Sequence, residues 1–374
     1  MQQRWFGLLI AMSIVAMLAI MVVPTASANG PSTAPNPAQV ENQVCLSCHS
    51  SKNLSMKLPS GETLSLYTDE AAFNQSMHGL QGMRCTACHT NISGYPHPPI
   101  TANDTRDFSL QMYTICRQCH DQEYQAQLDS NHAKALAAGN RNAAVCTDCH
   151  TAHYVTDPTT PRSRIPQTCR QCHSTIYDQY KSSVHGAALL DQSNPDVPTC
   201  IDCHGVHKIA DPTTNAFRLS SVQLCAKCHT DKVLMKRYNI STNVLNTYVA
   251  DFHGTTVELF EKQSPDQATN KPVCYDCHGV HNILAPDDPK STVMKDNLLK
   301  TCQQCHPDAT ADFPSSWMSH YDASPTQYPA VYYINLFYTI LIPVVVGGMA
   351  AFILLDIARR VLNRFQKSGA PSHE

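Results

Sequence analysis

The sequence predicts an all-α protein with low regular secondary structure, followed by one C-terminal transmembrane helix. Three observations lead to this fold class. The pattern C-x-x-C-H occurs nine times and uses all 18 cysteines. Aromatic residues make up only 7% of the chain, so an ordinary apolar core is not expected. Finally, Leu336–Leu355 is a run of 20 residues without a charge, long enough to cross a hydrocarbon core of about 30 Å.

C-x-x-C-H is the attachment motif of haem c. Its two thiols form thioether bonds to the haem vinyl groups, and its histidine is the proximal iron ligand. The predicted attachment cysteines are the pairs Cys45 and Cys48, Cys85 and Cys88, Cys116 and Cys119, Cys146 and Cys149, Cys169 and Cys172, Cys200 and Cys203, Cys225 and Cys228, Cys274 and Cys277, and Cys302 and Cys305. The predicted proximal ligands are His49, His89, His120, His150, His173, His204, His229, His278 and His306.

Zinc ribbons and disulfides are the alternative interpretations of paired cysteines. Neither needs a histidine directly after every second cysteine, and disulfides do not favour a two-residue gap at every pair. With 19 histidines in 374 residues, chance does not place nine of them so regularly. We therefore predict nine covalently bound haem c groups, which replace apolar side chains as the core of a haem-packed multihaem cytochrome c domain.

Nine further histidines lie between the first motif and the apolar run, one for each haem. Their number and recurring positions predict that every iron has two histidine ligands. The predicted distal ligands are His78, His97, His132, His153, His185, His207, His253, His281 and His320. His97 is the weakest candidate because it lies in a proline-rich loop, and His373 in the tail is left over.

Spacing predicts that a distal histidine binds a different haem from the motif before it. His132 follows His120 by twelve residues, about 18 Å along a helix, whereas the two ligand atoms on one iron are about 4 Å apart. His207 follows His204 by three residues and lies on the same side of that haem. The sequence leaves open which histidine serves which iron.

The motifs form an internal repeat. One copy consists of C-x-x-C-H, a helix, a histidine, a loop and C-x-x-C-H-x-x-H. Cys169–His207 is the clearest copy. Further copies are Cys116–His153, Cys225–His281, a looser first copy Cys45–His97 and a final half, Cys302–His320. We expect helices over Asp121–Ala138, Thr175–Leu190 and Leu234–Lys262.

The chain divides into six predicted segments. Residues 1–28 are a signal peptide or, alternatively, an N-terminal anchor, and residues 29–44, rich in proline, alanine, serine and asparagine, are a flexible linker. The nonahaem domain covers 45–321. A linker (322–335), the transmembrane helix (336–355) and a basic cytoplasmic tail (356–374) follow.

Basic residues orient the predicted membrane helix. Arg359, Arg360 and Arg364 follow it, so the positive-inside rule places the tail in the cytoplasm and the haems on the extracytoplasmic, periplasmic side. A buried core helix is the alternative. The run has no histidine for a b-type haem and no acidic or basic group, but Gly347 and Gly348 would let another helix approach closely. We therefore predict a separate membrane partner, a cytochrome b or quinol-oxidising subunit.

These motifs resemble those of bacterial membrane-anchored multihaem cytochromes c with doubled C-x-x-C-H. The resemblance rests on Cys203-His204-Gly205-Val206-His207, Cys277-His278-Gly279-Val280-His281 and Ser183-Val184-His185-Gly186, and it covers the whole motif-bearing segment. It implies an all-α fold with stacked haem pairs. Quinol-oxidising members of the family carry an N-terminal anchor and four or five haems, so this chain departs from them.

Two functions are compatible with these motifs. An electron-transfer conduit needs no open iron, and ligation without methionine favours a low potential. A reductase of a small nitrogen or sulfur oxyanion needs a five-coordinate haem, for which the haem served by His97 is the candidate. The conduit is the favoured interpretation, with no enzymatic activity and no catalytic residue. The net charge of −3, lowered further by haem propionates, gives no argument for nucleic acid, so redox proteins are the expected partners.

Overall fold

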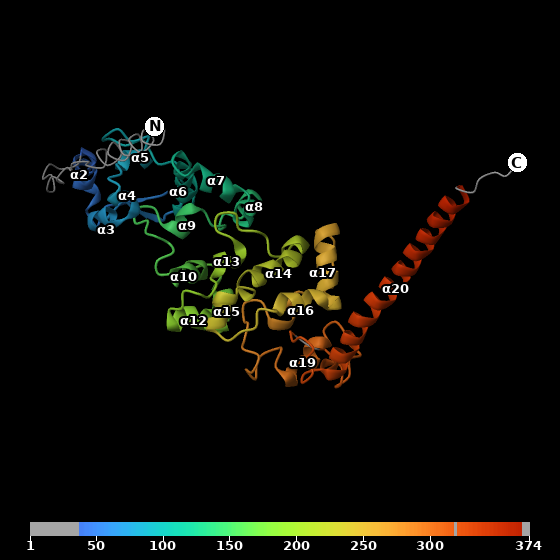
Figure 1. Ribbon diagram of the computed structural model, residues 1–374. Helices are drawn as coiled ribbons and strands as arrows, with labels where there is room; N and C mark the ends of the chain where they lie inside the picture. Colours follow the sequence, from blue (N-terminus) through green and yellow to red (C-terminus); the bar gives the residue numbers. More distant parts are fainter. Residues whose placement is uncertain (1–36, 318–319, 369–374) are drawn as a thin grey trace, which may run out of the picture. The chain divides into compact units, whose positions relative to one another are not determined.

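A computed structural model describes residues 37–317 and 320–368 of the chain (Figure 1). The predicted signal segment, residues 1–28, therefore lies outside the described residues. The chain forms two compact units: unit 1 contains residues up to Gln111 together with Ala152–Val155, and unit 2 contains Met112–Thr151 and Thr156 onward. The fold is mostly helical with little sheet, as the sequence predicts.

Unit 1 holds short helices and the two strands of the described chain. Its elements are α2 (Pro37–His49), β1 (Ser55–Lys57), β2 (Thr63–Ser65), α3 (Glu70–Gln75), α4 (Met77–Leu80), α5 (Cys85–Cys88) and α6 (Thr105–Met112), the last ending at the boundary. The strands pair antiparallel, with Met56 opposite Leu64.

Unit 2 contains a longer succession of short helices and then one long helix. They are η1 (Tyr113–Gln118), α7 (Asp121–Leu128), α8 (Asn131–Ala137), α9 (Cys146–His150), α10 (Arg164–Arg170), α11 (Ser174–Lys181), α12 (Val184–Gln192), α13 (Cys200–His204), α14 (Asn215–His229), α15 (Lys232–Arg237), α16 (Val244–Ala250), α17 (Phe252–Gln263), α18 (Cys274–His278), α19 (Lys295–Cys302), η2 (Pro314–Ser316) and α20 (Pro329–Ser368).

The three helices expected to be continuous are each interrupted, so that expectation was wrong. The helix expected over Asp121–Ala138 is α7 and α8, and the one over Thr175–Leu190 is α11 and α12. Ser130 and Ser183 stand at the breaks, where each adopts an extended backbone and caps the second helix. A serine hydroxyl that caps a helix competes with continuation of the preceding one. The expected helix over Leu234–Lys262 breaks twice, giving α15, α16 and α17.

Helix α2 begins inside the segment expected to be a flexible linker. It starts at Pro37, a residue favoured in a first helical turn, and runs into the first motif. Asn42 fixes it, because its side chain is 6% exposed, donates to the Met83 carbonyl and accepts from the Cys85 amide. Residues 37–44 of the expected linker are therefore helical. The rest of that linker, residues 29–36, lies outside the described residues. The expected linker 322–335 is likewise helical from Pro329.

The apolar core is small. One cluster of buried side chains, Leu219, Val222, Val257 and Val273, joins α14, α17 and the residue before α18. Such a core is far smaller than a segment of this length normally builds, which fits a domain that wraps cofactors.

Helix α20 is the long apolar helix predicted at the C-terminus. Within its candidate span, Pro329–Arg364, the apolar 18-residue window has a mean hydropathy of 2.5, and none of that window is buried against the described chain. The exposure does not support the alternative of a core helix. At 1.5 Å per residue the 40 residues of α20 extend about 60 Å, roughly twice a hydrocarbon core.

Candidate haem sites

The nine motifs occupy helix ends in two alternating ways. The first, third, fifth, seventh and ninth motifs close a helix, as Cys225–His229 closes α14. The second, fourth, sixth and eighth open one, as Cys200–His204 forms α13. In three of the opening motifs an aspartate caps its own helix: Asp148, Asp202 and Asp276 accept from the backbone amides of Val145, Thr199 and Val273 at 2.6–2.7 Å.

Four predicted distal histidines have the same local backbone structure. His78, His132, His185 and His253 are each the second residue of a helix that follows a sharp break. At the first three, a buried serine caps the helix: Ser76, Ser130 and Ser183 are 1–2% exposed, and their hydroxyls accept from the amide three residues on at 3.0–3.1 Å. Asp251 replaces serine in the fourth.

A glycine after three of these histidines allows the close approach at the break. A Cβ on Gly79, Gly186 or Gly254 would overlap the carbonyl oxygen of Phe73, Tyr180 or Tyr248 respectively. The break therefore brings the second helix against the end of the first.

A backbone hydrogen bond ties each of three such helices to the chain just beyond a later C-x-x-C-H-x-x-H. The first-residue amides of α4, α8 and α12 donate to the carbonyl that lies two residues after His153, His207 or His281. The bonds are Met77 to Val155 at 2.7 Å, Asn131 to Ile209 at 2.8 Å and Val184 to Ile283 at 2.9 Å. These backbone hydrogen bonds therefore join successive repeat copies close to the distal histidines.

A residue with positive φ follows the proximal histidine in three opening motifs. Gly205 has φ 82° and Gly279 has φ 85°, whereas Thr151 takes φ 62° without being glycine. The turn directs the next histidine away from its own motif. The β-branched threonine carries the backbone strain of a conformation that glycine adopts freely.

The histidine rings meet in pairs, each of one predicted proximal and one predicted distal residue. Eight pairs have ring centroids 6.0–6.3 Å apart: His49 with His97, His89 with His153, His150 with His207, His173 with His132, His204 with His281, His229 with His185, His278 with His320, and His306 with His253. His78 lies in α4 as described, and His120 precedes α7 with its Nδ1 4.0 Å from Glu123 Oε2.

The separation of these rings fits a haem iron between them. Two metal–imidazole bonds of about 2.0 Å, each extended by about 1.1 Å from the ring nitrogen to the ring centre, give about 6.2 Å. Among the described residues no three His, Cys, Asp or Glu side chains gather as a metal site, so the paired arrangement is unlike a zinc ribbon. The residues present therefore fit haem c.

Burial favours the neutral form of several of these histidines, the state in which imidazole binds a metal. The clearest case is His185, whose pKa falls to about 4 because burial, and secondarily the charge of His229, disfavours the imidazolium. Burial likewise lowers the pKa of His89, His153 and His278.

The cysteines of neighbouring motifs lie against one another without forming disulfides. All 18 are described and free. A hydrogen bond joins Cys116 to Cys146 and another joins Cys169 to Cys200; each lowers the pKa of the first thiol and raises that of the second. In haem c these sulfurs are thioethers and do not titrate. The pKa shifts of the thiols show that the two sulfurs of each pair lie close together.

Contacts also continue from one copy to the next in unit 2. Burial first, and then the nearby Cys169, raise the pKa of Cys149 to about 11. Cys203 beside Cys225 and Cys277 beside Cys302 show the same arrangement. With the Cys225–Cys274 hydrogen bond, each motif from the third to the eighth therefore has a cysteine near one of the next motif.

Several positioning residues were missed by sequence reasoning. The serine caps, the aspartate caps and the arginines that bind two of those aspartates, Arg162 and Arg218, hold the motif helices and the distal histidines in place. The signal was present as S-x-H before the second, fourth and sixth motifs and as C-x-D-C-H in the fourth, sixth and eighth.

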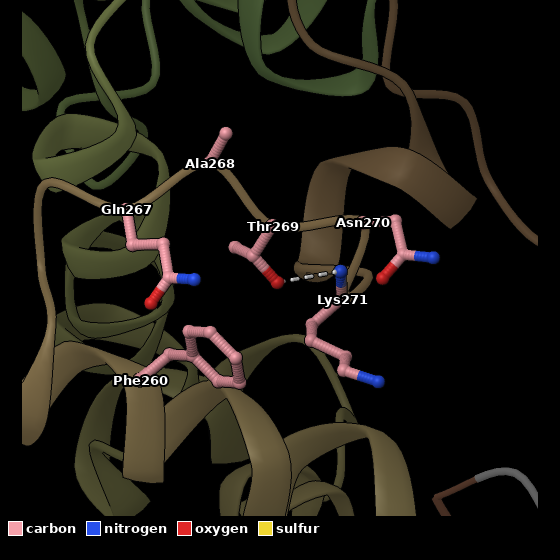
Figure 2. A pocket seen from close by; sticks show the side chains of 6 residues that line it. All are labelled: Phe260, Gln267, Ala268, Thr269, Asn270 and Lys271. Atoms are coloured by element: carbon pink, nitrogen blue, oxygen red, sulfur yellow. Dashed lines mark hydrogen bonds between the residues drawn. The ribbon is translucent and has the colours of Figure 1, made fainter.

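One cavity of the described chain is separate from these sites. It is an open hollow of about 540 Å³ lined by Phe260 and residues 267–271. Figure 2 shows the Lys271 amide donating to Thr269 Oγ1 at its wall. It contains no histidine or cysteine, so it offers no ligand to a haem iron.

Comparison with known proteins supports the class of the protein. A family model described as cytochrome c3 matches residues 141–230, a segment with four of the nine motifs. Together with the repeated motif and the fold, this match defines a multihaem cytochrome c, and it implies haem c as the cofactor. A curated relative is the multiheme cytochrome MtrA of Shewanella baltica (strain OS185), 25% identical over 250 residues, which cover 60% of this chain and 68% of the relative.

Proposed function

We propose that this multihaem cytochrome is a membrane-anchored electron-transfer conduit carrying nine haem c groups, each with two histidine ligands. The observation that carries the proposal is the pairing of proximal and distal rings at the separation that an iron between them requires. The distant similarity to MtrA, a protein described as a multiheme cytochrome, supports electron transfer as the general function of this chain.

On this proposal the chain's residues hold each haem in place and restrict its chemistry to electron transfer. The haem supplies a one-electron redox centre when bound. The cysteines of each motif would attach it covalently, and the two paired histidines would both ligate its iron, which would leave no ligand position for a substrate. Ligation by two histidines without methionine favours a low potential.

The contacts between motifs support a route for electrons. In unit 2, the third to the ninth motif adjoin one another through their cysteines, from Cys116 beside Cys146 to Cys277 beside Cys302. In unit 1, Cys85 is hydrogen bonded to Cys45. Haems attached at adjoining cysteines have neighbouring edges, which is the condition for rapid transfer between them.

The membrane end of the route is proposed from chain order. Helix α20 follows the ninth motif, so the haem at Cys302 and Cys305 is the port toward a membrane partner, a cytochrome b or quinol-oxidising subunit. The basic residues after the span support a cytoplasmic tail and an extracytoplasmic haem domain. An extracytoplasmic redox protein would exchange electrons elsewhere on the domain.

Haem content and spin state test this function. Pyridine haemochrome assay of the purified full chain is expected to give nine covalent haems, and low-temperature electron paramagnetic resonance is expected to show only low-spin ferric haem. A protein with zinc and no haem would contradict the entire proposal. Nine haems with one fully occupied high-spin centre would instead favour a reductase with an open iron.

A further inference from the structure

His97 differs from the other predicted distal histidines in its exposure. All nine are described, and eight of them are half-buried, whereas His97 is exposed together with every residue from 93 to 99. Tyr95, whose ring edge faces His97, is 93% exposed.

The hydrogen bond of His97 is to its own loop, and its stacked ring partner is His49. Its Nδ1 lies 2.8 Å from the Gly94 carbonyl, three residues back in the same loop. Within the described chain, the amides of residues 93–102 donate no backbone–backbone hydrogen bond. By contrast, His253 is beside Asp251 at the start of α17, with Nδ1 3.1 Å from Oδ1, and α17 packs against the core cluster through Val257.

The opposite ring, His49, is fixed. It ends helix α2, and its Nδ1 lies 2.6 Å from the Leu66 carbonyl. The Leu66 amide in turn donates to Leu54. A carbonyl partner on Nδ1 leaves Nε2 for a metal, so both His49 and His97 are oriented to bind, but only His49 is anchored to the rest of unit 1.

We propose that the haem attached at Cys45 and Cys48 exchanges its distal ligand: His97 leaves the iron with its loop, and a small uncharged ligand of ferrous haem, such as carbon monoxide, takes its place. In this step one iron–nitrogen bond breaks and one iron–carbon bond forms. A neutral ligand replaces a neutral imidazole, and no electron moves. The inference rests on the proposed bis-histidine ligation and assigns a ligand-binding site within it.

The exchange would change the redox behaviour of one haem of unit 1. The haem at Cys45 and Cys48 is the first in the chain, and a changed axial ligand changes the potential of an iron. Binding of a small ligand there would therefore affect electron transfer at this haem alone, while the other haems keep both histidines.

Carbon monoxide titration of the dithionite-reduced full chain in detergent tests the inference. The wild type is expected to bind one carbon monoxide per chain, seen as a Soret change of about one ninth of the total haem. Binding should reach a rate that no longer rises with ligand concentration, because departure of His97 limits it. His97→Ala is expected to bind the same single equivalent, at least about tenfold faster, and to show one high-spin ferric haem.

His253→Ala is the matched control, since that histidine stands at a helix start opposite His306 and is held by its own element. This variant is expected to bind two equivalents of carbon monoxide: one at the haem of Cys45 and Cys48, as in the wild type, and a new one at the haem of His306. The wild type is measured first, so the test does not depend on folding of a variant.

The possible failures are distinguishable. No binding by the wild type but one equivalent in His97→Ala would overturn the exchange and leave the proposed ligation intact. No binding by either protein would show that His97 is not a ligand at all. Two equivalents in His97→Ala would place the wild-type site elsewhere and also overturn the inference.

Discussion

A single backbone break decides where each distal histidine on an S-x-H segment points. Ser183 ends α11 by accepting from the Gly186 amide instead of letting the helix continue, and His185 thereby reaches His229 rather than the motif that precedes it in sequence. Loss of such a serine cap typically costs about 1 kcal/mol of stability. Loss of the Ser183 cap would have a larger effect on the position of the His185 ring.

Gly186→Ala tests this placement. The added Cβ overlaps the Tyr180 carbonyl, so α12 must move, with an expected stability loss on the order of 1–3 kcal/mol and one new high-spin haem in the electron paramagnetic resonance spectrum. Ala133→Gly is the control, because the equivalent site in the second copy already holds alanine. An unchanged spectrum for Gly186→Ala would separate the glycine from haem ligation.

At the scale of elements, the two kinds of motif helix are held differently. Helix α18 begins with Asp276 accepting from the Val273 amide, and Arg218 from α14 binds the same carboxylate through two nitrogens at 2.7–2.9 Å. This arginine–aspartate pair joins a motif that closes a helix to a motif that opens one. Bidentate, charge-assisted pairs are the stronger class of hydrogen bond.

Asp276→Asn is expected to lower the melting temperature more than Asp202→Asn. Both variants weaken a helix cap, but the Arg218–Asp276 side chains are 23% and 27% exposed, against 36% each for Arg162 and Asp202. Thermal unfolding of the holoprotein, followed by Soret circular dichroism, measures the difference, at about 2–4 °C per kcal/mol. Equal shifts would mean that the arginine contributes little and the cap dominates.

The sequence predicts the motif positions and the fold class because both depend on local patterns. It does not predict the breaks at Ser130 and Ser183. Each serine lies in a stretch whose residues favour a helix, and only the serine cap interrupts that helix. The start of α2 was missed because Asn42 is held by Met83 and Cys85, about 40 residues away. The partner of each histidine is equally non-local, as His281 and His204 show.

At the scale of the whole molecule, the ring pairs connect repeat copies in both directions. The S-x-H histidine of one copy meets the first motif of the next copy, as His132 meets His173. The second histidine of C-x-x-C-H-x-x-H meets a motif of the previous copy, as His207 meets His150. At the ends the pattern changes: His97 turns back to His49 within the first copy, and His320 closes the last pair.

The anchor helix carries a prediction at the same scale. A Cβ on Gly347 or Gly348 would meet nothing within 4 Å, so replacing both with leucine leaves the folded chain undisturbed but blocks close approach of another helix. If the proposed membrane partner packs against these glycines, the variant is expected to keep its haem content and to lose that partner in mild detergent, as measured by copurification. Reduction of the isolated wild-type chain by quinol in liposomes would contradict the need for such a subunit.

The direction of these connections has a consequence for how the protein is made. If the haem domain is extracytoplasmic, as proposed, the chain is exported from its N-terminus, and His132, His185 and His253 emerge before the motifs they face. His153, His207, His281 and His320 emerge 64, 57, 77 and 42 residues after His89, His150, His204 and His278. At ordinary rates of synthesis that delay is about 2 to 15 s. On the proposed ligation and location, the irons of these four pairs, like the iron between His49 and His97, would pass through maturation with one protein ligand, and His320 would complete the last of them.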